Sequence, residues 1–167
     1  MEPIVNKVAE SGLITIDLEE LYTPGERVLF DIKGWLFEEI ILKEKDFREQ
    51  IKQHDWSIYS NKLVAVTCSA DAIVPTWAFM LVATALAPYA QQVIFGDLIR
   101  MEEVLFDSKL NSLDLTSFSD QRIVIKGCSK VNVPVSAYVR LTALLQPVVK
   151  SIMYGEPCST VPVYKRK

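Results

Sequence analysis

The stretch Cys68-Ser69-Ala70-Asp71-Ala72-Ile73-Val74-Pro75 decides the fold prediction, because it forms a turn between a strand pattern and a helix pattern. The apolar run Leu63-Val64-Ala65-Val66 precedes it, and an apolar helical segment begins near Pro75. Proline suits the first turn of a helix, where its missing N–H costs nothing. The pattern therefore predicts a strand, then a tight turn with a thiol, a hydroxyl and a carboxylate, and then a helix.

The Cys-Ser pair recurs twice in the sequence. Ile123-Val124-Ile125 leads to Cys128-Ser129 and Val133-Pro134, and Cys158-Ser159 is followed by Val161-Pro162. All three cysteines thus precede a serine, with Val-Pro a few residues further on. The recurrence is too short and too unevenly spaced to predict a structural repeat.

Strand and helix patterns alternate from residue 62 onward, which predicts an α/β fold. We expect a mainly parallel sheet with right-handed crossovers and helices on both faces, a three-layer arrangement. We find no internal boundary and predict one domain over residues 1–167. The predicted strands are 62–67, 93–96 and 122–126, and the helices are 75–87, 98–108 and 134–154, the last one kinked at Pro147. An N-terminal extension holds predicted strands 13–18 and 27–32 and an amphipathic helix 37–53, and residues 156–167 form a tail.

Composition narrows the classes of function. The formal net charge of −3 gives no reason to expect a nucleic-acid partner. No apolar run is long enough to cross a bilayer, and no secretory signal is visible at the N-terminus, so we expect a cytoplasmic protein without a membrane partner. The high apolar content is also compatible with a homo-oligomeric interface. The 3 cysteines cannot all pair internally, and in a reducing compartment thiols serve packing, metal binding or catalysis.

The leading hypothesis is a metal site built from the three thiols. Cys68 and Cys128 each follow a predicted parallel strand, so both would project from the same edge of the sheet. Helix N-termini beside them would favour the thiolate form, which suits zinc or an iron–sulfur cluster. We assume that the tail brings Cys158 to the same edge. The predicted metal ligands are Cys68, Asp71, Cys128 and Cys158, with zinc as the metal and an iron–sulfur cluster as the alternative.

The fourth ligand and two other functions stay open. Asp71 lies in the same turn as Cys68 and is preferred, followed by Glu156 and then by His54, the only histidine. One alternative is an enzyme that uses Cys68 or Cys128 as a thiolate nucleophile in redox exchange or persulfide transfer. The other is an interaction module with inert buried cysteines, because cysteine is a small residue that packs readily in cores.

Four segments resemble a bacterial family of proteins of unknown function, domain-of-unknown-function family 2480. They are Asp55-Trp56-Ser57, the stretch 68–78, Lys126-Gly127-Cys128, and residues 153–162. The resemblance covers about residue 20 to the end and says little about activity. It implies an association with iron–sulfur assembly genes of the sulfur-mobilisation type, and hence a role in cluster assembly or sulfur handling with assembly proteins as partners.

A looser similarity is to scaffold proteins of that pathway, which hold zinc or a nascent cluster with three cysteines and an aspartate. The corresponding residues here would be those named above as metal ligands. Their spacing differs from the spacing in the scaffold family, so the similarity concerns the type of chemistry alone.

Overall fold

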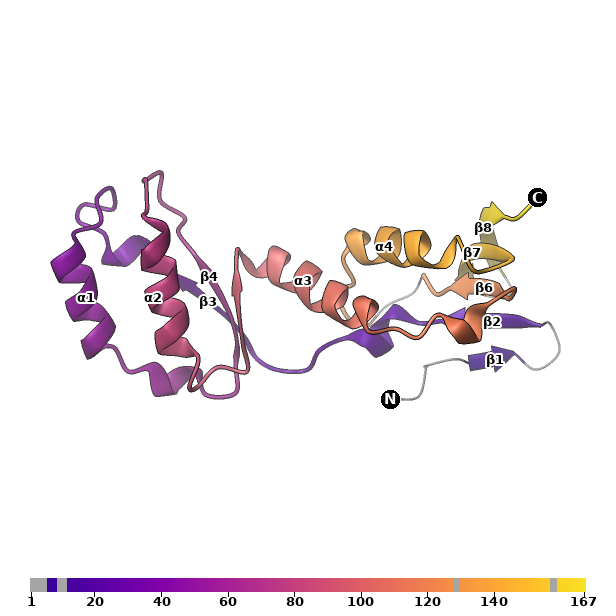
Figure 1. Cartoon of the computed structure of the whole chain (residues 1–167), viewed down its shortest axis with the longest axis horizontal. Coiled ribbons are helices and arrows are strands. Elements are labelled where there is room, and N and C mark those ends of the chain that lie inside the picture. Colours follow the sequence, from indigo (N-terminus) through magenta and orange to yellow (C-terminus); the bar gives the residue numbers. More distant parts are fainter. Residues whose placement is uncertain (1–5, 9–11, 128–129, 157–158) are drawn as a thin grey trace. The chain divides into compact units, whose positions relative to one another are not determined.

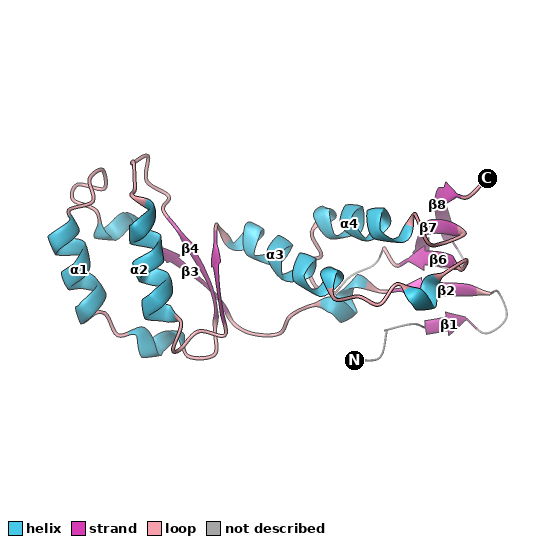
Figure 2. Cartoon of the chain, in the orientation of Figure 1, coloured by secondary structure: helices cyan, strands magenta, loops and turns pink. Residues whose placement is uncertain are grey.

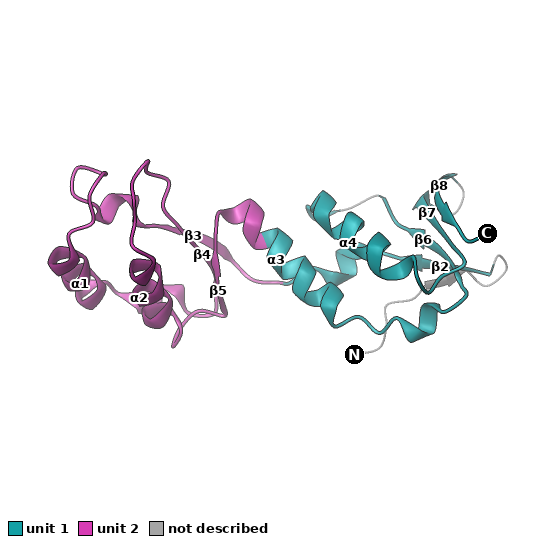
Figure 3. Ribbon diagram, turned by 45° about the horizontal axis from the view of Figure 1, so that its top comes forward, with its two compact units in different colours: residues 1–23, 102–167 teal, residues 24–101 magenta. Residues whose placement is uncertain are grey.

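A computed structural model describes residues 6–8, 12–127, 130–156 and 159–167. The chain forms two compact units: residues 1–23 together with 102–167 make unit 1, and residues 24–101 make unit 2 (Figure 3). The mixed α/β class with mainly parallel strand pairing is confirmed. A single domain over residues 1–167 stays a prediction, because two compact units can still unfold together as one.

Unit 2 is a parallel three-stranded sheet in the order β3-β4-β5, with two α-helices (Figures 1 and 2). Phe47 from α1 and Val82 from α2 belong to one core with Val64 and Val66 of β4. Both helices therefore pack on the same face of this sheet. The elements are β3 (Arg27–Asp31), η2 (Ile32–Trp35), α1 (Glu44–Gln53), η3 (Trp56–Tyr59), β4 (Leu63–Thr67), α2 (Thr76–Leu86) and β5 (Gln92–Phe95).

Unit 1 is a five-stranded sheet in the order β1-β2-β6-β7-β8. The central strands β2, β6 and β7 are parallel, and β1 and β8 add to the two edges in antiparallel orientation. Phe106 of α3 and Leu141 of α4 share one core with Ile123 of β6. The elements are β1 (Asn6–Val8), β2 (Leu13–Ile16), η1 (Leu18–Leu21), α3 (Leu98–Asn111), η4 (Thr116–Phe118), β6 (Arg122–Ile125), α4 (Val135–Leu145), β7 (Ser151–Glu156) and β8 (Ser159–Lys165).

The three-layer arrangement is not confirmed. The predicted single sheet is two separate sheets, and in each unit both helices share one core with the same face of their sheet. On the opposite faces, Ala65 of β4 and Val124 of β6 are also fully buried, so the central strand of each sheet is covered on both sides.

Two predicted helices have different bounds. The helix predicted over 37–53 begins only at Glu44, because Glu38 and Glu39 adopt left-handed φ angles of 51° and 59° that no α-helix contains. The helix predicted over 134–154 ends at Leu145, and residues 151–156 form β7. The predicted tail contains β8, which pairs with β7.

The two units contain the same succession of elements, and from α1 and α3 onward the matching positions are 59 residues apart in the sequence. Helices α2 and α4 have the same length, and each begins directly after a proline, Pro75 and Pro134. Phe47 and Phe106, which are buried in the two cores, stand at the same separation. The fully packed residues of the two helices also correspond, Ala78 with Ala137, Val82 with Leu141, and Leu86 with Leu145.

Corresponding loop residues of the two units are also 59 residues apart. Asp55 accepts a hydrogen bond from the backbone N–H of residue 57, and Asp114 accepts one from the backbone N–H of residue 116. Asn61 and Asp120 both adopt left-handed φ angles, 60° and 58°. Such agreement in loops, where sequences diverge readily, indicates that the units are two copies of one structural motif.

The C-terminal ends of β5 and β7, the last matching strands of the two units, have similar backbone conformations. Gly96 after β5 and Gly155 in β7 have φ angles of 133° and 119°, which favour glycine. Each unit also has an edge-to-face aromatic pair at corresponding positions. The ring centroids of Phe79 and Phe95 in unit 2 are 5.1 Å apart, and those of Tyr138 and Tyr154 in unit 1 are 5.9 Å apart.

The first strands complete the repeat. Asp31 at the end of β3 and Asp17 directly after β2 each accept a hydrogen bond at 3.0 Å from the backbone N–H two residues later, at the start of a 3₁₀-helix. The order β2, α3, β6, α4, β7 thus matches β3, α1, β4, α2, β5. Unit 2 is inserted in the sequence after β2 and η1 and ends within the first turn of α3. The exclusion of a structural repeat from the sequence is therefore wrong.

Candidate functional site

The carboxyl edge of the unit 2 sheet is fixed by Asp31. Its Oδ1 accepts hydrogen bonds from the backbone N–H groups of Lys33 at 3.0 Å and Ser69 at 3.1 Å, and its Oδ2 accepts one from the Ser69 hydroxyl at 2.5 Å. The Asp31 carboxylate therefore ties the loop after β4 to the end of β3. Burial acts to raise the pKa of Asp31, but the hydrogen bonds from Ser69 and Lys33 outweigh it and hold the pKa below its ordinary value.

Replacement of Asp31 by alanine is expected to destabilise unit 2 by about 1–2 kcal/mol at neutral pH. Because the pKa of Asp31 is lower in the folded protein than in the unfolded chain, its contribution is complete above about pH 4 and disappears as the pH falls through the folded value. Urea unfolding at pH 7 and pH 3 should show the gap between wild type and Asp31→Ala shrinking in acid. Asp71→Ala, which changes an exposed carboxylate, is the control, and a gap of equal size at both pH values would contradict this role.

Unit 1 uses a different contact at the corresponding edge. Asp17 forms an ion pair with Lys126 at 3.3 Å, where unit 2 has Asp31 and Ser69. The hydrogen bond and charge of Asp17 raise the pKa of Lys126, and burial together with the charge of Asp17 raises the pKa of Glu20. These contacts hold β2 to the end of β6.

Cys68 is half-buried and packs against the unit 2 core. Its Sγ lies 4.0 Å from the backbone oxygen of Ala70, the outer limit for a hydrogen bond to sulfur. This environment is that of a packing residue.

The predicted function as a Cys-rich metal-binding protein is contradicted, whereas the ligand set itself stays a prediction. No group of three or more His, Cys, Asp or Glu residues in the described part of the chain could hold a metal ion. Cys68 and the exposed Asp71 lie in one loop of unit 2, and Cys128 and Cys158 lie outside the described residues. The Cys-rich metal-binding function, whether zinc or iron–sulfur, therefore has no support in the described structure.

The two other predicted ligands have different surroundings. His54 follows α1 and lies among aromatic rings of unit 2, with its Nε2 3.0 Å from the Tyr59 hydroxyl and its ring 4.8 Å from the Trp56 ring. Glu156 ends β7 in unit 1. The imidazole is thus part of an aromatic cluster.

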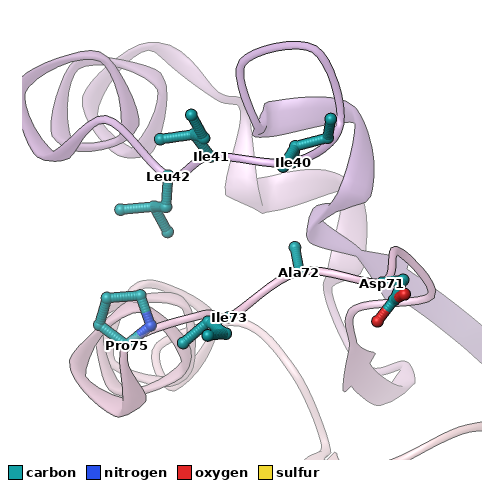
Figure 4. A pocket seen from close by; sticks show the side chains of 7 residues that line it. All are labelled: Ile40, Ile41, Leu42, Asp71, Ala72, Ile73 and Pro75. Carbon is teal, nitrogen blue, oxygen red and sulfur yellow. The ribbon is translucent and has the colours of Figure 1, made fainter.

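An apolar groove lies beside the loop that follows β4. Its volume is about 420 Å³, which is within the range of ligand-binding clefts. Two segments of unit 2 face each other across it, one before α1 and one between β4 and α2, with Asp71 at one end (Figure 4). The lining residues are Ile40, Ile41, Leu42, Asp71, Ala72, Ile73 and Pro75.

A strained turn at Glu38 and Glu39 precedes the residues that form one wall of this groove. Glu38 and Glu39 both have left-handed φ angles, a conformation that costs of order 1 kcal/mol or more for each residue other than glycine. The backbone N–H of Phe37 donates to the Ile41 carbonyl at 2.7 Å, which closes the turn. As a result Ile40 and Ile41 remain 59% and 55% exposed.

Within the described residues, the segment that forms one wall of the groove has no counterpart in unit 1. The segment that contains Ile40 and Ile41 connects η2 to α1, whereas after η1 the chain runs into unit 2. At the separation of 59 residues, Asp71 and Ile73 correspond to Lys130 and Asn132. The groove is thus a feature that distinguishes unit 2 from its structural copy. Ile40 and Ile41 fall inside the amphipathic helix predicted over 37–53, and neither they nor Asp31 were predicted as site residues.

Fold and site together define a duplicated α/β protein with an apolar groove on its inserted unit. The chain belongs to the family described as protein of unknown function (DUF2480), whose model matches residues 2–166. The predicted family is confirmed, whereas the implied link to iron–sulfur assembly genes is not shown. Comparisons with curated proteins and with solved structures gave no match. No helix in the described ranges is long and apolar enough to span a membrane.

Proposed function

We propose that this protein is a binding module that holds an apolar side chain of a partner protein in the unit 2 groove. The observation that carries the proposal is the position of Ile73, which is 97% exposed and lines the groove in the segment opposite Ile40 and Ile41. Grouped exposed aliphatic side chains are typical of interaction sites, because burying each one against a partner is favourable by about 1.5–3 kcal/mol.

The charges at the groove indicate the chemistry of the partner. Asp71 is exposed and enters no hydrogen bond or ion pair within the described residues, and Glu38 stands on the turn at the other wall. A partner segment with an aliphatic or aromatic anchor next to a lysine or arginine would complement both the apolar wall and these carboxylates. The strain in the turn also favours a functional role, since strained backbone collects at binding sites.

Cys68 fits the same proposal. Its sulfur packs on the core of unit 2, which supports the interaction module with inert cysteines for this residue. The loop that contains it is fixed by Asp31, so Ile73 is presented from a constrained segment.

A random peptide library displayed on phage tests the proposal. Peptides selected on the full chain should contain an aliphatic or aromatic residue near Lys or Arg. The substitution Ile73→Asp is expected to weaken their binding about 10- to 100-fold, the equivalent of one buried isoleucine. Isothermal titration calorimetry with the best synthetic peptide measures this change.

Two further variants make the result specific. Asp71→Lys should weaken the same peptides and favour peptides with Asp or Glu in place of the basic residue. Val139→Asp changes a side chain of unit 1 that is 65% exposed, so it should leave binding unchanged. Equal affinity of wild type and Ile73→Asp for every selected peptide, or selection of none, would overturn the proposal.

A further inference from the structure

The structural repeat shows which sheet edges of unit 2 lack a neighbouring strand. In unit 1 the outer edge of β7 is covered by β8, and the outer edge of β2 is covered by β1. β5 corresponds to β7 and β3 to β2, yet in the described residues the unit 2 sheet ends at both of them. The same motif therefore accepts an antiparallel strand at an edge that unit 2 leaves unpaired.

The two unpaired edge strands, β3 and β5, differ in the residues that protect an edge against pairing with another strand. Edge strands are usually protected against pairing by charged residues or proline. β3 carries Arg27 and Asp31 and follows Pro24, whereas the sequence from Gln91 to Gly96, which contains β5, has neither a charge nor a proline. β5 is therefore the edge that can pair with another strand.

The helix α2 next to β5 also carries no charged residue. Phe95 is 68% exposed and rests edge-on against Phe79 of α2. α2 contains no charged residue and exposes 62% of Met80, whereas α4 carries Arg140, which pairs with Asp107 at 3.5 Å. The edge strand and the neighbouring helix thus form one apolar surface.

We propose that β5 and α2 form a homodimer interface, in which β5 pairs antiparallel with β5 of a second copy about a twofold axis. Such an interface brings the same surface against itself, so any charge at its centre would face an equal charge. The uncharged β5 and α2 meet this requirement. The groove does not, because Asp71 and Glu38 would face their own copies. Pairing would join the two unit 2 sheets into one continuous sheet and cover the exposed parts of Phe95 and Met80.

Sedimentation equilibrium of the full chain tests the proposal. The chain mass is 18.9 kDa, and we expect about twice this mass for the wild type. Phe95→Lys and Met80→Lys should each shift the protein to the monomer mass, because each places like charges on both sides of the twofold axis. Leu29→Lys, on the β3 edge, should remain dimeric, and so should the groove variant Ile73→Asp.

Amide hydrogen exchange provides the second measurement. The β5 amides should exchange slowly in concentrated protein and faster on dilution, whereas the β3 amides should not depend on concentration. Tryptophan fluorescence of the lysine variants establishes that unit 2 is folded. A wild type that is monomeric at high micromolar concentration, or a folded Phe95→Lys that is still dimeric with protected β5 amides, would overturn the proposal.

Discussion

Phe106→Ala is expected to lower the free energy of unfolding by about 3–5 kcal/mol, and Phe47→Ala by a similar amount. Each phenylalanine is almost completely buried, and they occupy corresponding positions in the cores of units 1 and 2. Removal of either ring leaves a cavity that the surrounding helices and strands can fill only in part. Phe37→Ala, at a side chain that is 46% exposed, should cost less than about 1 kcal/mol and is the control.

The three tryptophans allow the two units to be followed separately. Trp35, Trp56 and Trp77 all lie in unit 2, so their fluorescence in urea reports on unit 2, whereas far-UV circular dichroism reports on both units. If the units unfold separately, Phe106→Ala will shift the circular dichroism transition and leave the fluorescence transition in place. If both probes shift together in both variants, the prediction of one domain holds. Losses below 1 kcal/mol in both variants would contradict the core assignment.

Gly155→Ala is expected to cost at least about 2 kcal/mol. The φ angle of Gly155 is 119°, and a Cβ atom there would lie 2.5 Å from the backbone oxygen of Ser159. Because this oxygen belongs to the paired strand β8, relief of the clash would disturb the β7–β8 pairing. Thermal unfolding by circular dichroism should show a fall of roughly 2–4 °C for each kcal/mol.

Two other glycines provide the comparison. Gly96 is the counterpart of Gly155, with a φ angle of 133°, and an added Cβ would lie 2.7 Å from Cγ and 2.8 Å from Cβ of Arg100, at the base of that side chain. Gly96→Ala should therefore also be destabilising. Gly34 has no atom within 4 Å of an added Cβ, so Gly34→Ala should be close to neutral. An unchanged melting temperature in Gly155→Ala would show that the turn adapts.

Strands buried on both faces were the most predictable elements. The runs that became β4 and β6 are continuous apolar segments followed by turn residues, and these features identified them correctly. The carboxyl-edge position of the loop with Cys68 followed from the same argument. The Asp97 side chain accepts a hydrogen bond from the backbone N–H of Arg100 at the start of α3.

The secondary structure of short apolar segments was harder to predict, because their periodicity does not distinguish a strand from a helix. Residues 148–154 continue the apolar pattern of α4, and only the pairing of β7 with β6 and β8 makes residues 151–156 a strand. Pro147 was interpreted as a kink, but α4 ends at Leu145 and does not reach it. β8 contains Pro162, which weakened its strand signal.

The metal hypothesis failed because it relied on the wrong alignment of the recurring segments. At the separation of 59 residues Pro75 corresponds to Pro134, but Cys68 corresponds to Gly127 and not to Cys128. The Val-Pro pairs recur because each helix of the repeat begins at the same place. The cysteines are out of register with the repeat, so their recurrence is no sign of a shared ligand set. Long-range contacts such as Asp31 with Ser69 leave no local signal in the sequence.

The insertion of unit 2 after β2 and η1 has a consequence for folding during translation. All of residues 24–101 leave the ribosome before β6, the parallel neighbour of β2, is synthesised. The nascent β2 strand therefore stays unpaired with β6 during this time. Unit 2, in contrast, already contains all three strands of its own sheet. A chain that folds as it emerges would complete the inserted copy first, and its folding would shorten the effective loop that later brings β2 to β6.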